Sequence, residues 1–169
     1  MTLYLKKKLY AFSFCFYSFF IFLFVFLNGC GTKEELVVFE ANVLAFYDNI
    51  SALNDSMDRI DSSSPDAVTL VNNHLSSLQS ELEAFAELEV PAQFSNIETM
   101  ADDAVYFIRE AARLYRDAYE DNYINESYIQ GAAENYESAM KRVEYIAILL
   151  QGKVPEDAVL LIEDKNDSE

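Results

Sequence analysis

The sequence has few of the residues from which catalytic and metal sites are usually built. It contains two cysteines, one histidine (His74) and no tryptophan. Cys15 lies inside a long apolar run and Cys30 closely follows that run, so the rest of the chain has no thiol for a disulfide or a cysteine-based zinc site. A nucleophilic triad, and most acid–base sites, would have to use His74.

Basic residues are also scarce. The chain has 12 Lys and Arg against 29 Asp and Glu, a formal net charge of −17. This charge repels phosphate backbones, so we expect no nucleic-acid partner. It also repels anionic lipid head groups. Divalent cations or basic partners would be attracted, although strong negative charge more often serves to keep a protein soluble.

The first 30 residues differ in composition from the rest of the chain. Lys6, Lys7 and Lys8 precede an uncharged, phenylalanine-rich run over residues 9–27, which is typical of a secretory signal. The run ends in Leu27-Asn28-Gly29-Cys30, which resembles the lipobox of bacterial lipoproteins, with Asn28 in place of the usual small or apolar residue. The resemblance covers residues 1–31 only.

This resemblance implies that the protein is attached to the cell membrane. It implies cleavage between Gly29 and Cys30, removal of residues 1–29, and a diacylglycerol on the Cys30 thiol, which would hold the chain on the extracytoplasmic side of the cell membrane. Two acyl chains bind a bilayer durably. The run is also long enough to span a bilayer as an uncleaved anchor. Either interpretation keeps the lysines in the cytoplasm and the acidic part outside.

The chain beyond the leader is large enough for one domain. Of the 169 residues, 29 precede Cys30, which leaves 140 residues with nine basic and 29 acidic side chains, a net charge of −20. A chain of this length can bury a hydrophobic core without disulfides.

Proline and glycine are rare, with three and four residues, and long helical patterns fill the space between them. Four segments carry apolar side chains at alternating steps of three and four residues, which places them on one face of a helix. We expect helices over about 33–61, 65–88, 91–121 and 126–151. Their apolar positions are Leu36, Phe39, Val43, Phe46, Ile50, Leu53, Met57 and Ile60; Val68, Val71, Leu75, Leu78, Leu82 and Phe85; Phe94, Ile97, Ala101, Ala104, Ile108, Ala111, Tyr115 and Ala118; and Ile129, Ala132, Tyr136, Ala139, Val143, Ile146 and Leu150.

Local signals mark the ends of these helices. Thr32 and Glu35 have the spacing of a capping box. Ser64 suits an N-cap with Pro65 at the first helical position. Pro91 interrupts the pattern because the residue before a proline is pushed out of the helical region. Gly152 suits a left-handed residue at the end of the last helix.

Short connections force neighbouring helices to run antiparallel. We therefore predict an all-α fold, an antiparallel up-down-up-down four-helix bundle over residues 30–152, followed by an acidic tail over residues 153–169.

No pattern of residues predicts a catalytic site, a metal site or a cofactor. His74 lies one step from the Leu75 position, beside two asparagines, so we expect it on a solvated helix flank. The predicted apolar faces carry no Glu, Asp or His, which argues against di-iron and haem centres. Asp55, Asp58 and Asp61 share a helix face but lack the spacing and glycine of an EF-hand loop.

Arginines gather in the second half of the chain. Arg109, Arg113 and Arg116 could clamp an anion. Ordinary ion pairing is the simpler interpretation. A turn near residue 123 would place Arg113 opposite Glu134 and Arg109 opposite Glu137. Within the helix, Arg113–Asp117 and Arg116–Glu120 are i,i+4 partners.

Tyrosines gather at the same end of the predicted bundle. Tyr115 and Tyr136 occupy apolar-face positions, so we expect them in the core. Tyr119, Tyr123 and Tyr128 surround the predicted last turn and form a candidate interaction patch, because tyrosine offers a flat apolar area with a polar tip.

Two kinds of binding function remain, and an enzyme is the least supported. The first is a non-enzymatic interaction module for a protein or glycan of the cell envelope, acting through the tyrosine-rich end. The alternative is an envelope binding protein for a small ligand or cation. A cavity between the helices would favour the ligand binder, and a filled interior with exposed aromatic residues would favour the partner binder.

Overall fold

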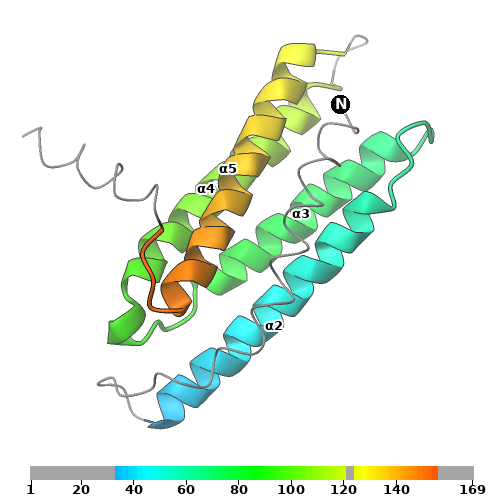
Figure 1. Ribbon diagram of the computed structural model, residues 1–169. Coiled ribbons are helices and arrows are strands. Elements are labelled where there is room, and N and C mark those ends of the chain that lie inside the picture. The colour runs from blue at the N-terminus through cyan, green and yellow to red at the C-terminus, as the bar shows by residue number, and fades with distance from the viewer. Residues whose placement is uncertain (1–32, 121–123, 156–169) are drawn as a thin grey trace, which may run out of the picture.

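The computed structural model describes residues 33–120 and 124–155. It consists of helices α2 (Lys33–Asp58), α3 (Ala67–Ala86), α4 (Asn96–Asp117) and α5 (Glu126–Leu150), with a short 3₁₀ helix η1 (Ala92–Phe94) before α4. Figure 1 shows α2 and α3 as one antiparallel hairpin and α4 and α5 as a second, so that the chain runs up, down, up and down. The predicted all-α bundle is confirmed.

The helices start and end close to the predicted positions, with two differences. Ser64 is not the N-cap of the second helix, because α3 begins at Ala67 with Asp66 in the N-cap position. The serine-rich segment instead folds into turns. The Asp61 carboxylate accepts hydrogen bonds from the Ser63 amide at 2.9 Å and the Ser63 hydroxyl at 2.8 Å, and the Ser64 hydroxyl accepts one from the Asp66 amide at 3.3 Å.

The third helix is shorter than the predicted 91–121. The Phe94 amide donates to the Pro91 carbonyl at 2.7 Å in a 3₁₀ turn, and α4 proper begins only at Asn96 and ends at Asp117. The expected start at Pro91 is therefore wrong by one turn, because the chain first makes the tighter i→i+3 bonds.

Both ends of helix α5 are capped, and the cap at Gly152 is the predicted one. The Asn125 side chain accepts a hydrogen bond from the Tyr128 amide at 3.2 Å. At the other end Gly152 has φ of 69°, its amide donates to Leu149 at 2.8 Å, and the Lys153 amide donates to Ile148 at 3.2 Å. These two bonds form a Schellman motif. The expected Thr32 cap of the first helix lies outside the described residues.

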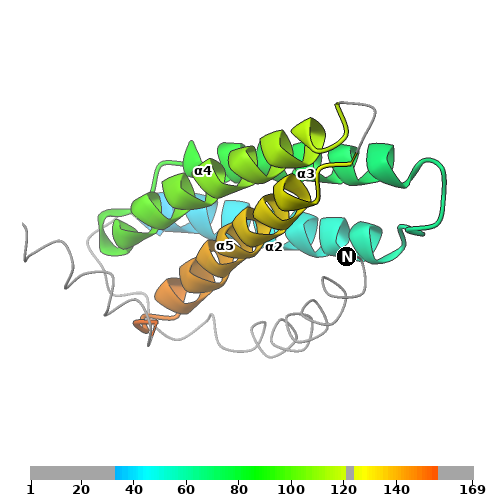
Figure 2. The ribbon, with the colours of Figure 1, turned by 90° about the horizontal axis from the view of Figure 1, so that it is seen from above.

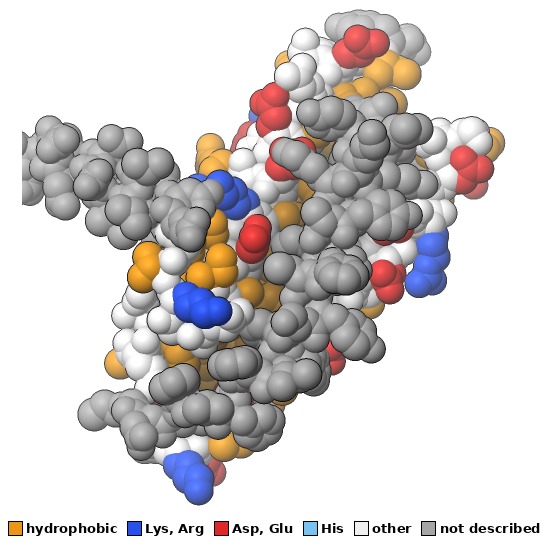
Figure 3. Space-filling model, in the orientation of Figure 1, with side chains coloured by type: hydrophobic (Ala, Val, Ile, Leu, Met, Phe, Trp, Pro, Cys, Tyr) orange, Lys and Arg blue, Asp and Glu red, His pale blue; other side chains and the backbone are white. Residues whose placement is uncertain are grey.

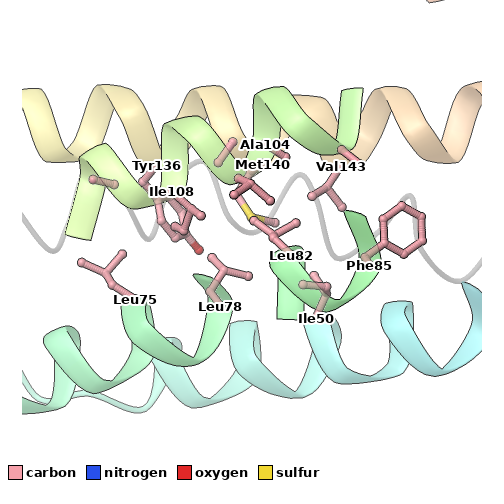
Figure 4. Packing of buried hydrophobic residues seen from close by; sticks show 14 of the residues in the cluster. Ile50, Leu75, Leu78, Leu82, Phe85, Ala104, Ile108, Tyr136, Met140 and Val143 are labelled. Carbon is pink, nitrogen blue, oxygen red and sulfur yellow. The ribbon is translucent and has the colours of Figure 1, made fainter. Parts of the chain in front are cut away.

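One core joins the two hairpins. Figure 4 shows Ile50, Leu75, Leu78 and Leu82 of the first hairpin pointing toward side chains of α4 and α5. Largest among the fully buried side chains are Val43, Ile50, Leu78, Leu82, Ile97, Ile108, Val143 and Ile146. All of them occupy predicted apolar-face positions.

Helices α4 and α5 form the most extensive helix pair. Small side chains allow them to approach closely, and Ala104, Ala111 and Ala139 are fully buried. A Cβ atom added at Gly131 would come within 3.2 Å of Leu114 Cδ1. The helix pair is therefore near the limit of close approach at this position.

Helices α2 and α5 are joined by two tyrosine hydroxyls. Tyr47 of α2 donates to the Val143 carbonyl of α5 at 3.1 Å, and Tyr136 of α5 donates to the Asn54 side-chain oxygen of α2 at 3.4 Å. Seen from above, α5 runs obliquely across the α2–α3 hairpin (Figure 2). These two bonds fix where α5 crosses α2.

Helix α2 is long and apolar enough to cross a membrane, with a mean hydropathy of 1.3 over 18 of its residues. A helix in the core of a soluble protein can be equally long and apolar. Leu36, Phe39, Val43 and Phe46 of α2 are buried within the structure, and the Phe39 and Phe94 rings stack at 5.6 Å. Val37 and Val38, by contrast, are more than half exposed.

Candidate binding site at the distal end of the bundle

The end of the bundle farthest from the start of α2 contains a cavity. We call it the distal end: it comprises the α2–α3 connection, the end of α4 and the start of α5. The 26 residues of α2, at about 1.5 Å per residue, separate it from Lys33 by about 39 Å.

This distal cavity has a volume of about 240 Å³ and lies between the two hairpins. An apolar cavity of about 150 Å³ is already large enough to bind benzene. The first hairpin contributes Met57, Ile60, Ser62, Ala67, Val68, Val71 and Leu75 to its lining, and the second contributes Tyr115, Tyr119, Ala132, Ala133 and Tyr136.

The cavity exists because small side chains meet at this end of the bundle. Ala67 of α3 faces the space from one side, and Ala132 and Ala133 of α5 face it from the other. The chain supplies no leucine or phenylalanine at these three positions, so the helices leave a void that larger side chains fill elsewhere in the core. The wall is therefore mostly apolar, with the tyrosines and Ser62 as its polar members.

Three tyrosines give the cavity its polar groups. Tyr115 and Tyr136 are buried, and burial raises the pKa of both hydroxyls. The Tyr119 ring lies 5.2 Å from the Tyr115 ring, and its hydroxyl further raises the pKa of Tyr115. The Tyr115 and Tyr136 hydroxyls therefore serve as neutral donors and acceptors at physiological pH.

His74 lies beside this site and not on a solvated flank, so the expectation for it was wrong. It is only 4% exposed, and its ring lies 6.1 Å from the Tyr136 ring. Neither ring nitrogen has a hydrogen-bond partner among the described residues. Burial lowers the pKa of His74 to about 4, so the imidazole is neutral near pH 7.

The spacing of the sequence contained the signal for this burial. His74 follows Val71 by three residues and precedes Leu78 by four, which are the same steps that define the apolar face. Leu75 follows Val71 by four residues and precedes Leu78 by three, so it also lies on the apolar face. The face is therefore wide enough to include both His74 and Leu75.

Asp58 is a partly buried polar residue of α2 that is not among the residues lining the cavity. Its Oδ1 atom is buried and has no hydrogen-bond partner within the part of the chain that the structure describes. After burial, the Asp58 carboxylate is the next cause of the raised Tyr136 pKa. Asp55 and Asp61 are exposed, and residues 33–120 and 124–155 hold no group of three or more His, Cys, Asp or Glu that could bind a metal ion.

Two tyrosines of the predicted patch, Tyr119 and Tyr128, are described, and they differ in exposure. Tyr119 is partly buried against the core and lines the distal cavity, whereas Tyr128 is 42% exposed in the first turn of α5. Tyr123 lies outside the described residues. Ile124, at the start of the described chain before α5, is 60% exposed.

Two arginines of α4, Arg109 and Arg113, are held by acidic side chains. Arg109 pairs with Glu83 of α3 at 2.7 Å, and Arg113 pairs with Glu110 at 2.9 Å and Asp117 at 2.8 Å. The expected ion pair between Arg113 and Asp117 is present. The expected pairing of Arg113 with Glu134 is not, since Glu134 accepts a hydrogen bond from Gln130 at 2.8 Å.

Arg109 therefore reaches toward Glu83 of α3. One ion pair between α4 and α5 joins Asp103 and Arg142 at 3.7 Å, and Arg142 also lies over the Phe107 ring at 4.8 Å. Arg116 is exposed in the last turn of α4. On the face drawn in Figure 3, Lys and Arg side chains stand apart from one another.

Gly29 and Cys30, the expected cleavage and lipidation residues, lie outside the described residues. Comparison of the chain with protein-family models, with curated proteins and with solved structures finds no match.

Proposed function

We propose that the protein is a lipid-anchored, non-enzymatic binding protein of the cell envelope that holds a small ligand in its distal cavity. The cavity itself supports this function, because a mostly apolar space with a few convergent polar groups is the usual form of a ligand site. Its 240 Å³ would accommodate a molecule somewhat larger than benzene.

The proposed anchor agrees with the position of the cavity. A lipid on Cys30 would hold the chain only three residues before the first residue of α2. The cavity would then lie about 39 Å farther along the helix, near the end that points away from the bilayer. A ligand could enter there without first entering the membrane.

An interaction module for a protein or glycan of the cell envelope is the second candidate. The observation that favours it is the exposure of Ile124 and Tyr128 around the start of α5. Exposed aromatic and aliphatic side chains at the tip of a helical hairpin suit a partner surface. The cavity favours the ligand binder over this candidate.

The anchor is tested by Cys30→Ala. We expect the variant to accumulate as a larger precursor without lipid, because thioether formation precedes cleavage in the bacterial lipoprotein pathway that the leader resembles. Mass spectrometry would report both the retained leader and the missing diacylglycerol. Equal mass and equal lipid content in wild type and variant would refute the lipobox.

The cavity is tested by filling it. Ala133→Phe places a large side chain into the space from α5, and Ala84→Phe adds the same side chain at an exposed position of α3 as a control. With 1-hexanol as the probe, equilibrium dialysis of the chain in phosphatidylcholine nanodiscs should detect binding above that of empty nanodiscs. We expect Ala133→Phe alone to abolish it; no excess binding by the wild type would refute a ligand cavity.

A further inference from the structure

The wall of the distal cavity carries no charge. None of the described residues that line it is Asp, Glu, Lys, Arg or His. The lining residues with a polar side chain are Ser62 and three tyrosines, and burial raises the pKa of Tyr115 and Tyr136, which keeps both hydroxyls neutral. A charged group that entered this space would lose its water without gaining a counter-charge. The cavity therefore favours an uncharged ligand.

Three aromatic rings belong to this wall. Tyr115 lies in the last turn of α4 and Tyr119 just beyond it, and their ring centroids are 5.2 Å apart with 53° between the ring planes. Tyr136 of α5 adds a third ring, and Met57 of α2 adds a thioether. Aromatic rings pack well against other rings in offset or edge-to-face contacts, and methionine sulfur packs well against ring edges. A flat aromatic body is therefore favoured over a saturated body of the same size.

Tyr119 is the most accessible of the three rings. Tyr115 and Tyr136 are buried, and the Tyr136 hydroxyl already donates to Asn54 at 3.4 Å. Tyr119 is only partly buried against the core, and it lines the cavity together with Ser62, which is exposed. A ligand that enters from solvent can therefore contact the Tyr119 ring without displacing a core side chain.

We infer, on the basis of the proposed function, that the ligand is an uncharged aromatic molecule with one substituted ring. Its ring packs against Tyr119, and its body occupies the space beside Ala133. The cavity volume of about 240 Å³ suits this size, because about 150 Å³ already holds benzene. Tyr119 thus selects the class of ligand, and Ala133 and its neighbours limit its size.

Four probes with a methyl-substituted six-membered ring test this ligand class. p-Cresol and 4-methylcyclohexanol share a neutral hydroxyl and differ in aromatic character, whereas 4-methylbenzylamine and 4-methylbenzoate carry a positive and a negative charge at pH 7. Equilibrium dialysis with the full chain in phosphatidylcholine nanodiscs, corrected for empty nanodiscs, should give p-cresol an affinity about fivefold above that of 4-methylcyclohexanol. Both charged probes should bind about tenfold more weakly than p-cresol. A charged probe that binds as tightly as p-cresol would overturn the inference.

The matched variants are Tyr119→Leu and Tyr128→Leu. Both replace one tyrosine ring by an aliphatic side chain, but Tyr128 is 42% exposed and is not among the residues that line the cavity. We expect the preference for p-cresol over 4-methylcyclohexanol to fall below about twofold in Tyr119→Leu and to persist in Tyr128→Leu. An unchanged preference in Tyr119→Leu, or its loss in both variants, would show that Tyr119 does not select the ring.

The outcomes for the cavity and for the ligand class are distinct. Equal binding of p-cresol and 4-methylcyclohexanol that Ala133→Phe abolishes would overturn the ligand class and leave the cavity function intact. Absence of binding by all four probes would overturn both proposals.

If Tyr119→Leu fails to fold, nuclear Overhauser contacts in the wild type decide. The ring protons of bound p-cresol should contact the Tyr119 ring and the Ala133 methyl group. Contacts only with other parts of the chain would overturn the inference.

Discussion

His74 is held in its neutral form by its surroundings. It lies between the apolar side chains of α3 and the ring of Tyr136, with neither nitrogen paired among the described residues, and burial lowers its pKa to about 4. In the unfolded chain the pKa returns to about 6.5. Folding therefore opposes protonation of this one residue.

We expect this opposition to appear as a pH-dependent stability. Above pH 6.5 the His74 imidazole is neutral in both the folded and the unfolded chain, so its titration does not lower the free energy of unfolding. As the pH falls toward 4, the unfolded state takes up a proton first, so the free energy of unfolding drops by about 2 kcal/mol between pH 7 and pH 5. Urea denaturation at pH 7, 6 and 5 should show this loss in the wild type and little of it in His74→Phe.

The change in the free energy of unfolding with pH is measured separately for the wild type and for His74→Phe. Any effect of phenylalanine on packing is the same at each pH and therefore cancels. Glu83, whose carboxylate pKa is lowered by hydrogen bonds from Gln79 and Arg109, loses its contribution only below pH 4.5, outside this window. An equal slope in both proteins would show that His74 is not the titrating group.

At the scale of elements, Tyr47 is the residue that ties α2 to α5 most directly. Burial raises the pKa of its hydroxyl, which remains a neutral donor to the Val143 carbonyl at 3.1 Å. We expect Tyr47→Phe to lower the free energy of unfolding by about 1 kcal/mol, the net value of a typical buried hydrogen bond.

Tyr106→Phe is the matched control for this prediction. Tyr106 is 62% exposed, so removal of its hydroxyl should change stability by less than about 0.3 kcal/mol. Urea denaturation of both variants checks the difference. If the two variants were equally stable, the Tyr47 hydrogen bond would contribute nothing to the docking of the two hairpins.

The end of α5 depends on a backbone conformation that few residues tolerate. Gly152 has φ of 69° with open space around it, so an added methyl group meets no neighbour but strains the backbone. We expect Gly152→Ala to cost about 1 kcal/mol. In the helix interior, Gly131→Ala should stabilise α5 because alanine has the higher helix propensity. The added Cβ would lie 3.2 Å from the flexible tip of Leu114, which opposes this gain.

Thermal unfolding of the two glycine variants separates backbone strain from packing. Gly152→Ala should melt at a lower temperature than wild type, and Gly131→Ala should not. A reversed order would mean that the close approach of α4 and α5 at Leu114 outweighs the strained helix end.

At the scale of the whole molecule, charge repulsion opposes the fold. The net charge is −17, and the ion pairs of Arg109 and Arg113 are exposed, so each contributes little to stability. Salt screens repulsion and attraction alike, but the repulsion involves many more charges. We therefore expect the melting temperature in nanodiscs to rise by roughly 2–5 °C from 10 mM to 300 mM NaCl. A fall would mean that the ion pairs dominate.

The architecture follows from local spacing. Positions such as Ile50, Leu78, Ile108 and Val143 recur at helical steps, and each is fully buried because a single apolar face on each helix leaves few ways to exclude water. The Gly152 helix end is equally local, since a left-handed residue needs only its own φ angle. Fold class, helix order and most of the core were therefore predictable without coordinates.

The site was not predictable in the same way. His74 and Leu75 are adjacent and the helical spacing is compatible with burial of both, but it does not show that α5 places the Tyr136 ring beside His74. The partner of Arg109 is Glu83, 26 residues away, and side chains on different helices meet according to docking geometry that no spacing rule specifies.

The amino-acid sequence by itself determined four amphipathic helices, their order, their approximate bounds and an acidic surface, because these depend on neighbours within a few residues along the chain. Only the tertiary structure decided that Ala67, Ala132 and Ala133 meet to leave a cavity, and that His74 is buried near the ring of Tyr136. Both features arise where two hairpins dock, and the space between docked helices depends on side chains that are distant in sequence.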